Sequence, residues 1–132
     1  MKAISVFRFG GPEELQLNEI ERPKPGKGEI LVKLAYAGVN FIDVYMRNGS
    51  YVRSHTYKTQ LPMIVGLEGA GTVAELGDGV EEFSQGELVA YCLAVGSYAE
   101  YAAVPVWRVV KIPQHISLPV ATALMLQGFT GH

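Results

Sequence analysis

Cysteine is almost absent from this sequence. Cys92 is the only cysteine in the 132 residues, so no disulfide can form within the chain. A protein without disulfides is typical of the reducing cytoplasm, where we expect this one to reside. Because Cys92 lies in the apolar run from Leu88 to Leu93, a small buried core residue is favoured over a reactive thiol.

The chain also lacks long apolar runs. The longest weakly polar stretch, residues 116–131, is too short for a membrane-spanning helix and contains Pro119 and Gln127. The N-terminal residues have no apolar segment of the length found in signal peptides. We therefore expect neither membrane association nor export.

The sequence has no large excess of positive or of negative charge. The 11 Lys and Arg residues nearly balance the 13 Asp and Glu residues, for a formal net charge of -2. This balance gives no electrostatic reason to expect nucleic acid or an anionic membrane as a partner. With 48% hydrophobic and 18% charged residues, the composition is that of a folded globular domain.

Residues that bind metals are sparse. His55, His115 and His132 show no metal-ligand spacing, and a single cysteine cannot form the four-cysteine cluster of a structural zinc site. The sequence therefore predicts no metal site.

Short strand-like runs dominate what is present, and turn residues separate them at fairly even spacing. Residues 50–62 have no clear period and predict an exposed loop. Such a series of strands indicates a mainly β fold, either an antiparallel β-barrel or a sandwich. The expected strands are Ala3–Phe9, Leu15–Ile20, Glu29–Val39, Met63–Leu76, Glu87–Leu93, Ser97–Val104 and Val109–Ile112.

Two segments change to a helical period. Phe41–Asn48 is expected to be a short helix, with Asn40 as N-cap and Gly49 as C-cap. A second helix is expected after Ser117, with Gly128 as a candidate for its end. Its apolar face would consist of Leu118, Ala121, Thr122, Met125 and Phe129. Since no further element follows to cover this face, we expect the chain to be part of a longer protein.

Residues 69–74, GAGTVA, match the dinucleotide-binding fingerprint G-x-G-x-x-G/A. The fingerprint requires a helix that begins within it and an acidic residue about twenty positions later. Here Gly77 and Gly79 would stop such a helix, Thr72 and Val73 prefer strands, and Val89 stands at the later position. We interpret these glycines as strand residues that allow a bend or a close backbone approach.

Six blocks in order resemble the medium-chain dehydrogenases/reductases, and among them the zeta-crystallin-like NADPH-dependent quinone oxidoreductases. The blocks are MKAISVFRFGGPEELQL, GEILVKLAYAGVNFIDVYMRNGSY, PMIVGLEGAGTVAELGDGV, GELVAY, GSYAEYAAVP and ALMLQGFTGH. The resemblance implies a GroES-like β-barrel over residues 1–116. Residues 117–132 would then begin the connection to a Rossmann domain that binds NADPH and is absent here. It also implies a homodimeric full-length protein and an isolated fragment without activity.

The resemblance places Asn40 and Leu67 where zinc-dependent relatives have catalytic Cys and His, and Glu68 follows them. Asn is a poor zinc ligand and Leu is none, so a zinc-independent reaction is implied. Glu68 is then expected to be a structural hydrogen-bonding residue rather than a base.

The same resemblance implies the site residues. Asn40, Tyr45 and Tyr51 would line the quinone pocket, and Asp43 lies in the same helix. Asn40 would also contact the cofactor, together with Gln127, Gly128 and Thr130. Plainer roles stay open at this point, with Asn40 as a helix cap, Tyr45 in the core and Asp43 paired with Arg47.

The leading hypothesis is hydride transfer from NADPH to a quinone. An enone or acyl-chain reductase of the same superfamily is the nearest alternative. A stand-alone GroES-like module without catalysis is the alternative from another class.

Overall fold

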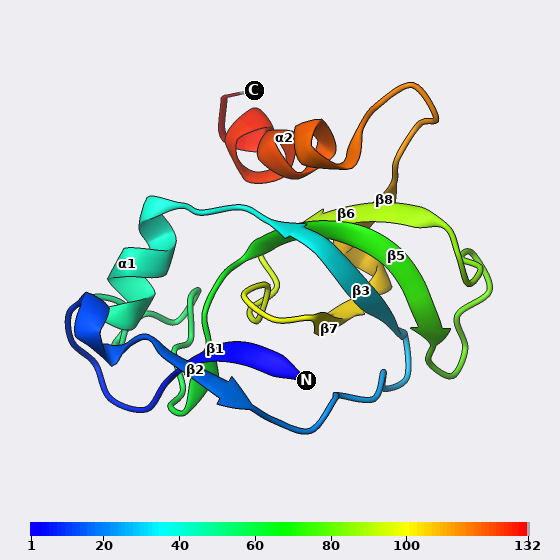
Figure 1. The fold of residues 1–132 in the computed structure, drawn as a ribbon. Coiled ribbons are helices and arrows are strands. Elements are labelled where there is room, and N and C mark those ends of the chain that lie inside the picture. Colours follow the sequence, from blue (N-terminus) through cyan, green and yellow to red (C-terminus); the bar gives the residue numbers. More distant parts are fainter. Residues whose placement is uncertain (132) are drawn as a thin grey trace.

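The computed structural model describes residues 1–131, and it is built mainly from antiparallel strands (Figure 1). A curved five-stranded sheet has the order β7-β3-β5-β6-β8, and a smaller three-stranded sheet has the order β2-β1-β4. The large sheet contains β3 (Glu29–Ala37), β5 (Glu68–Leu76), β6 (Leu88–Cys92), β7 (Tyr101–Pro105) and β8 (Val109–Lys111). The small sheet contains β1 (Lys2–Val6), β2 (Gln16–Glu19) and β4 (Met63–Ile64).

The main core lies within the curve of the large sheet. Ile30, Leu31 and Val32 on β3 are all fully buried, so this part of the strand is covered on both faces. Ile30 and Val32 point into the same cluster as the buried side chains of the neighbouring strands. This cluster includes Val73, Val89, Tyr91, Ala102 and Val104.

The GAGTVA stretch lies within β5, as the sequence predicts. Gly71 pairs with Leu34 of β3, beside an irregularity in the strand register. A Cβ atom on Gly71 would lie 1.9 Å from the carbonyl oxygen of Lys33, so only glycine allows the two backbones to approach this closely. The residue therefore shapes the sheet.

Several expected strand bounds are wrong. Met63–Leu76 is not one strand, because β4 pairs with β1 and β5 begins only at Glu68 in the other sheet. The strand expected over Ser97–Val104 begins at Tyr101, preceded by an isolated bridge between Ala3 and Ala99. The chain changes from one sheet to the other at such points, and the pattern of apolar residues does not indicate that change.

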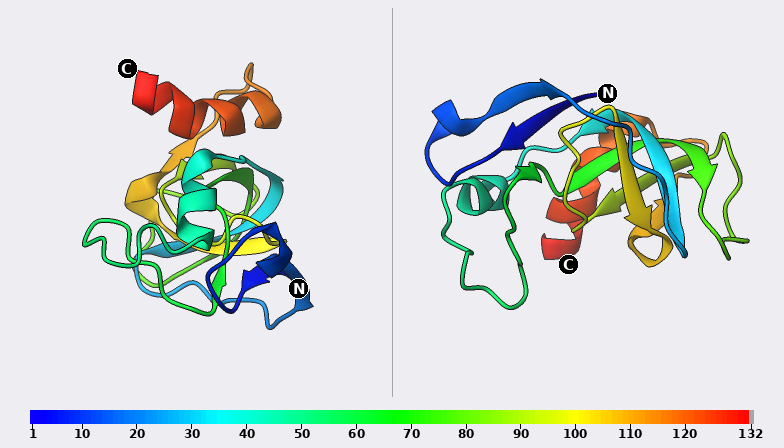
Figure 2. Two further views of the ribbon diagram at one scale, coloured as in Figure 1. Left: turned by 90° about the vertical axis from the view of Figure 1, so that its left-hand side faces the viewer. Right: turned by 90° about the horizontal axis from the view of Figure 1, so that it is seen from below.

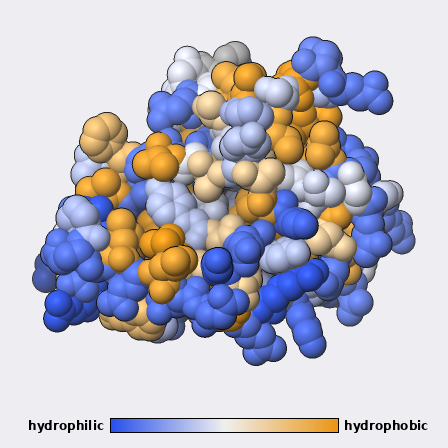
Figure 3. Space-filling model, in the orientation of Figure 1, coloured by the Kyte–Doolittle hydropathy of each residue, from blue (hydrophilic) through white to orange (hydrophobic). Residues whose placement is uncertain are grey.

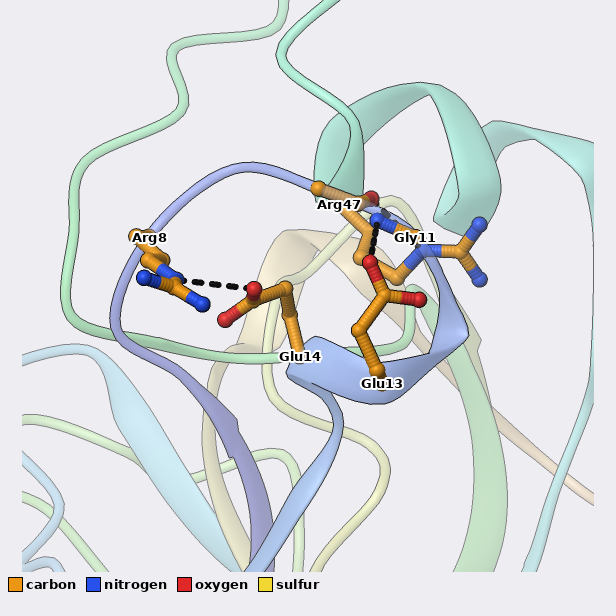
Figure 4. A network of polar contacts seen from close by, with 6 residues as sticks. Arg8, Gly11, Glu13, Glu14 and Arg47 are labelled. Carbon is orange, nitrogen blue, oxygen red and sulfur yellow. Dashed lines mark hydrogen bonds and ion pairs between the residues drawn. The ribbon is translucent and has the colours of Figure 1, made fainter.

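Helix α1 (Phe41–Arg47) begins after Asn40, as expected, and is held at its other end by the turn between β1 and β2. The Arg47 Nε donates to the Gly10 carbonyl at 3.2 Å, and the Gly10 N–H donates to the Arg47 carbonyl at 3.2 Å. Within the same turn, which includes the 3-10 segment η1 (Pro12–Glu14), Glu14 accepts from the Arg8 guanidinium at 2.8 Å (Figure 4).

Helix α2 (Leu118–Gly131) lies outside the large sheet, as Figure 1 and the left view of Figure 2 show. Ala121 and Met125 pack on Ala70 and Ala90 of β5 and β6, and these small side chains allow the helix to lie close to the sheet. Two expectations are wrong here. The helix does not end at Gly128, which lies within its last turns, and Phe129 is 64% exposed rather than on the buried face.

Apolar side chains remain exposed along α2. Orange atoms gather there in the space-filling view (Figure 3), and the exposed residues on this helix include Val120, Leu124 and Phe129. Within residues 1–131, no helix has the length and apolarity needed to cross a bilayer.

Candidate functional site

Asn40 joins the two helices through its side chain. It is 6% exposed and stands immediately before α1, at the end of the turn that follows β3. Its Nδ2 donates to Glu68 Oε1 at 3.0 Å, and its Oδ1 accepts from Gln127 Nε2 on α2 at 2.9 Å. The amide group therefore links separate elements. Asn40 also forms a capping box with Asp43 at the start of α1, which agrees with its expected role as N-cap.

Glu68 is the centre of this network. It is fully buried at the start of β5, and its second oxygen, Oε2, accepts from the Leu126 backbone N–H of α2. A Cβ atom on Gly38 would lie 1.8 Å from Glu68 Oε1, so a glycine is required there to admit the carboxylate. Both carboxylate oxygens have donors, which agrees with the structural role expected for Glu68.

Asp43 lies beside Asn40, but it does not pair with Arg47. Its Oδ2 accepts from the Asn40 backbone N–H at 2.9 Å and from the Tyr98 hydroxyl at 2.8 Å. The expected Asp43–Arg47 pair is wrong, because Arg47 reaches the Gly10 carbonyl instead. Burial raises the pKa of Asp43, and the hydrogen bond from Asn40 only partly opposes that shift. Its other oxygen, Oδ1, is buried without a partner among the described residues.

Tyr45 and Tyr51 lie together, apart from the Asn40 network. Tyr45 is 43% exposed, and its ring contacts Tyr51 edge-on with 5.8 Å between the centroids. Tyr51 in turn contacts Tyr57 at 5.2 Å. The segment 50–62 is therefore not wholly exposed as expected, since Tyr51 and Leu61 pack against the cluster around Val6 and Met46.

An apolar hollow of about 370 Å³ lies between the helices and is the natural place for a flat organic ligand. Its lining consists of Ile42, Tyr57, Cys92, Leu93, Leu126, Phe129 and Thr130. For convenience we call it the inter-helix hollow. Of the expected site residues, only Thr130 lines it, and Gln127 follows the lining residue Leu126 on α2. Asn40 and Asp43 instead line a separate hollow of about 210 Å³.

Two residues that line the inter-helix hollow were not predicted from the sequence. Tyr57 belongs to a polar loop without any period, and no signal in the sequence distinguishes it from Tyr45 or Tyr51. Leu93 has a φ of 62°, a left-handed conformation that costs energy for a branched side chain and often marks functional sites. Leucine carries no sequence signal for that conformation.

The remaining predicted residues are more exposed. Gly128 is on the open face of α2, and the Thr130 hydroxyl donates to the Leu126 carbonyl at 2.8 Å. Cys92 is half-buried instead of fully buried. Burial, with a smaller effect from the nearby Glu68 carboxylate, raises the pKa of its thiol, so the thiolate is disfavoured.

The donor set around Asn40 does not suit zinc. Leu67 is buried and has no ligating atom, and the oxygens of Glu68 already accept hydrogen bonds from Asn40 and Leu126. In the part of the chain that is described, no three His, Cys, Asp or Glu side chains form a group able to hold a metal. His132 lies outside the described residues.

Comparison with known proteins agrees with this geometry. Residues 26–114 match the family described as the alcohol dehydrogenase GroES-like domain. The chain is 41% identical to a probable quinone oxidoreductase of Schizosaccharomyces pombe over 130 residues, covering 98% of this chain and 38% of the relative. It is 33% identical to a 2-haloacrylate reductase of a Burkholderia species, covering 97% of this chain and 39% of the relative.

Solved structures show the same similarity in three dimensions. A mycobacterial protein in complex with NADPH superimposes with a TM-score of 0.91 at 38% identity, covering 100% of this chain and 40% of that one. The Escherichia coli quinone oxidoreductase in complex with NADPH gives 0.90 at 34% identity, covering 98% and 39%. The chain thus spans about two fifths of the length of these relatives. It belongs to the alcohol dehydrogenase GroES-like domain family, as an N-terminal domain of the medium-chain dehydrogenase/reductase superfamily.

Proposed function

We propose that this chain is the substrate-side domain of a zinc-independent, NADPH-dependent quinone oxidoreductase. The observation that carries the proposal is the inter-helix hollow, which is apolar and of a size for a ring system. One of its lining residues, Leu126, donates its backbone N–H to Glu68, the centre of the network with Asn40 and Gln127. The similarity to quinone oxidoreductases over nearly the whole chain supports the same reaction.

In this proposal residues 1–116 form the catalytic domain and residues 117–132 begin the connection to a nucleotide-binding domain. Helix α2 fits that role because its inner face packs on the sheet while Leu124 and Phe129 stay exposed for another domain to cover. The whole protein would be a cytoplasmic homodimer that does not bind nucleic acid or membranes.

Asn40 and Gln127 would set the polar edge of the site. Glu68 fixes the Asn40 amide, and Asn40 Oδ1 orients Gln127, so both side chains are held by hydrogen bonds before any ligand arrives. Gln127, Gly128 and Thr130 would contact the nicotinamide end of the cofactor. NADPH, when bound, supplies the hydride.

Tyr57 and Leu93 would hold the quinone ring. Tyr57 presents an aromatic side chain to the inter-helix hollow, and stacking on such a ring suits a flat quinone. Tyr45 and Tyr51 would support Tyr57 indirectly, because the Tyr45 ring contacts Tyr51 and the Tyr51 ring contacts Tyr57. Asp43 would position Asn40 through its backbone N–H.

The proposed reaction does without zinc for two reasons: a quinone does not need it, and the chain lacks the side chains to bind it. A quinone accepts a hydride without strong polarisation of its oxygen, so positioning and hydrogen-bond donors can replace a Lewis acid. The side chains at Asn40 and Leu67 agree with such a site.

The test is NADPH oxidation by the product of the whole reading frame, with a para-quinone as acceptor. Asn40→Ala should lower kcat/KM at least about tenfold, since it removes a preorganised hydrogen-bonding group. Asn18→Ala, on β2 outside the network, is the matched control and should leave the rate unchanged. No quinone-dependent oxidation by the wild type would refute the proposal. The 132-residue chain alone should turn over no NADPH, and turnover by it would contradict the missing-domain assignment.

A second candidate is reduction of an activated carbon–carbon double bond. The similarity to a 2-haloacrylate reductase favours it, because that protein's substrate is an α,β-unsaturated carboxylate. Comparing a quinone with an α,β-unsaturated ketone and with 2-chloroacrylate as acceptors separates the two reactions.

A further inference from the structure

A second hollow, of about 240 Å³, shares Tyr57 and Leu93 with the inter-helix hollow. We call it the Arg108 hollow. Besides Tyr57 and Leu93, its apolar lining residues are Met46, Leu67 and Val95. The polar lining residues are His55, Thr56, Lys58 and Arg108.

The charges on this hollow are all of one kind. Arg108 and Lys58 are cationic, His55 also lines the cavity, and no acidic side chain does so. None of these three residues takes part in an ion pair within residues 1–131. The buried Glu68 carboxylate already accepts from Asn40 and Leu126. The Arg108 hollow therefore carries positive charge that no acidic side chain of its lining neutralises.

Arg108 lacks a hydrogen-bond acceptor. Its Nε is buried and has no partner in the described part of the chain. Its guanidinium lies 4.4 Å from the centre of the Trp107 ring, on the 3-10 segment η2 (Val106–Arg108), which holds the group in place without satisfying its N–H donors. A buried guanidinium donor is ordinarily paired, so an acceptor is missing from this site.

We propose that the Arg108 hollow binds an anionic substituent, of the carboxylate type, carried by the substrate. This rests on the proposed function, because it takes the inter-helix hollow as the place of the reacting ring. A ring packed there against Tyr57 and Leu93 could extend a substituent past these shared residues toward Arg108. The planar fork of a guanidinium matches a carboxylate, and the strained Leu93 lies at the boundary between the two hollows.

Two anthraquinones of similar size, one with an anionic and one with a neutral substituent, test this. Anthraquinone-2-carboxylate and 2-(hydroxymethyl)anthraquinone should both bind the 132-residue chain in calorimetric titrations, the carboxylate about tenfold more tightly. Arg108→Gln should abolish that preference while leaving the affinity of the neutral quinone unchanged. Arg108→Lys, which keeps the charge but loses the fork, should retain part of the preference and also serves if Arg108→Gln fails to fold. Arg53→Gln, an exposed arginine outside the hollow, is the matched control.

The outcomes separate this proposal from the function on which it rests. Equal affinity for the two quinones, unaffected by Arg108→Gln, would refute the anionic subsite and leave the quinone site standing. No binding of either quinone would refute the ring site, and the subsite with it. If instead NADP⁺ binds the chain and Arg108→Gln weakens that binding about tenfold, the hollow holds a cofactor phosphate and the proposal is wrong.

Discussion

Gly71→Ala should destabilise the fold without acting through a nucleotide. The added Cβ would lie 1.9 Å from the Lys33 carbonyl oxygen, whereas such carbon and oxygen atoms ordinarily stay about 3.3 Å apart. The strands β3 and β5 would therefore have to separate by about 1.4 Å, the difference between those two distances. This atom is backbone, so no side-chain rotation can relieve the contact.

The cost follows from that separation. Overpacking in a core costs about 1–3 kcal/mol, and a ladder hydrogen bond weakened by the shift adds about 1 kcal/mol. We expect a loss of about 3 kcal/mol in the free energy of unfolding, or about 10 °C in Tm for a domain of this size. Thermal and urea unfolding followed by circular dichroism measure both quantities.

Gly128→Ala is the matched control. Its Cβ would meet only Leu124 Cβ at 3.8 Å, an ordinary contact, on the exposed face of α2. Alanine should therefore stabilise the helix by about 0.5–1 kcal/mol. If Gly71→Ala kept the stability of the wild type and instead weakened nucleotide binding, the interpretation of GAGTVA as a strand would be wrong.

Two further substitutions probe buried polar groups. Tyr91→Phe removes a hydroxyl that is buried without a partner among the described residues, so urea unfolding should show a gain of about 1 kcal/mol; a loss of similar size would mean that the hydroxyl is satisfied. Asp43→Asn keeps the shape of a side chain whose pKa is raised by burial. A raised pKa means that the wild type loses stability as the pH rises from the ordinary pKa of an aspartate through the raised pKa, because the ionised form is disfavoured in the folded state. The stability of Asp43→Asn relative to wild type should therefore be greater at about pH 7 than at about pH 4 in urea unfolding curves, and an opposite trend would contradict the assigned shift.

The local parts of the fold could be predicted because they depend on neighbouring residues. The strand over Glu29–Ala37, the strand character of Thr72 and Val73 and the start of α1 after Asn40 all follow from side chains within a few positions. The bounds failed where tertiary contacts intervene. Residues 63–76 form one apolar pattern, yet they divide between two sheets, and α2 continues through Gly128 because its inner face is packed on the sheet.

The candidate site was predicted less well than the fold. Asn40 and Gln127 share a hydrogen bond, but Tyr45 and Tyr51 do not line the inter-helix hollow, whereas Tyr57 does. All three residues are tyrosines, and they lie close together in the sequence. Which of them reaches a cavity depends on the path of the loop, and residue type does not encode that path.

The sequence by itself determined that this is a mainly β domain, that its GAGTVA stretch is a strand, and that Leu67 offers no ligand to a metal. These conclusions need only residue type and local spacing. The tertiary structure decided the direction of the Asn40 amide, the partners of Glu68 and the unsatisfied state of Arg108. The Asn40 contacts join residues 28 and 87 positions apart, and contacts at such separations are set by how the sheets and helices pack against one another.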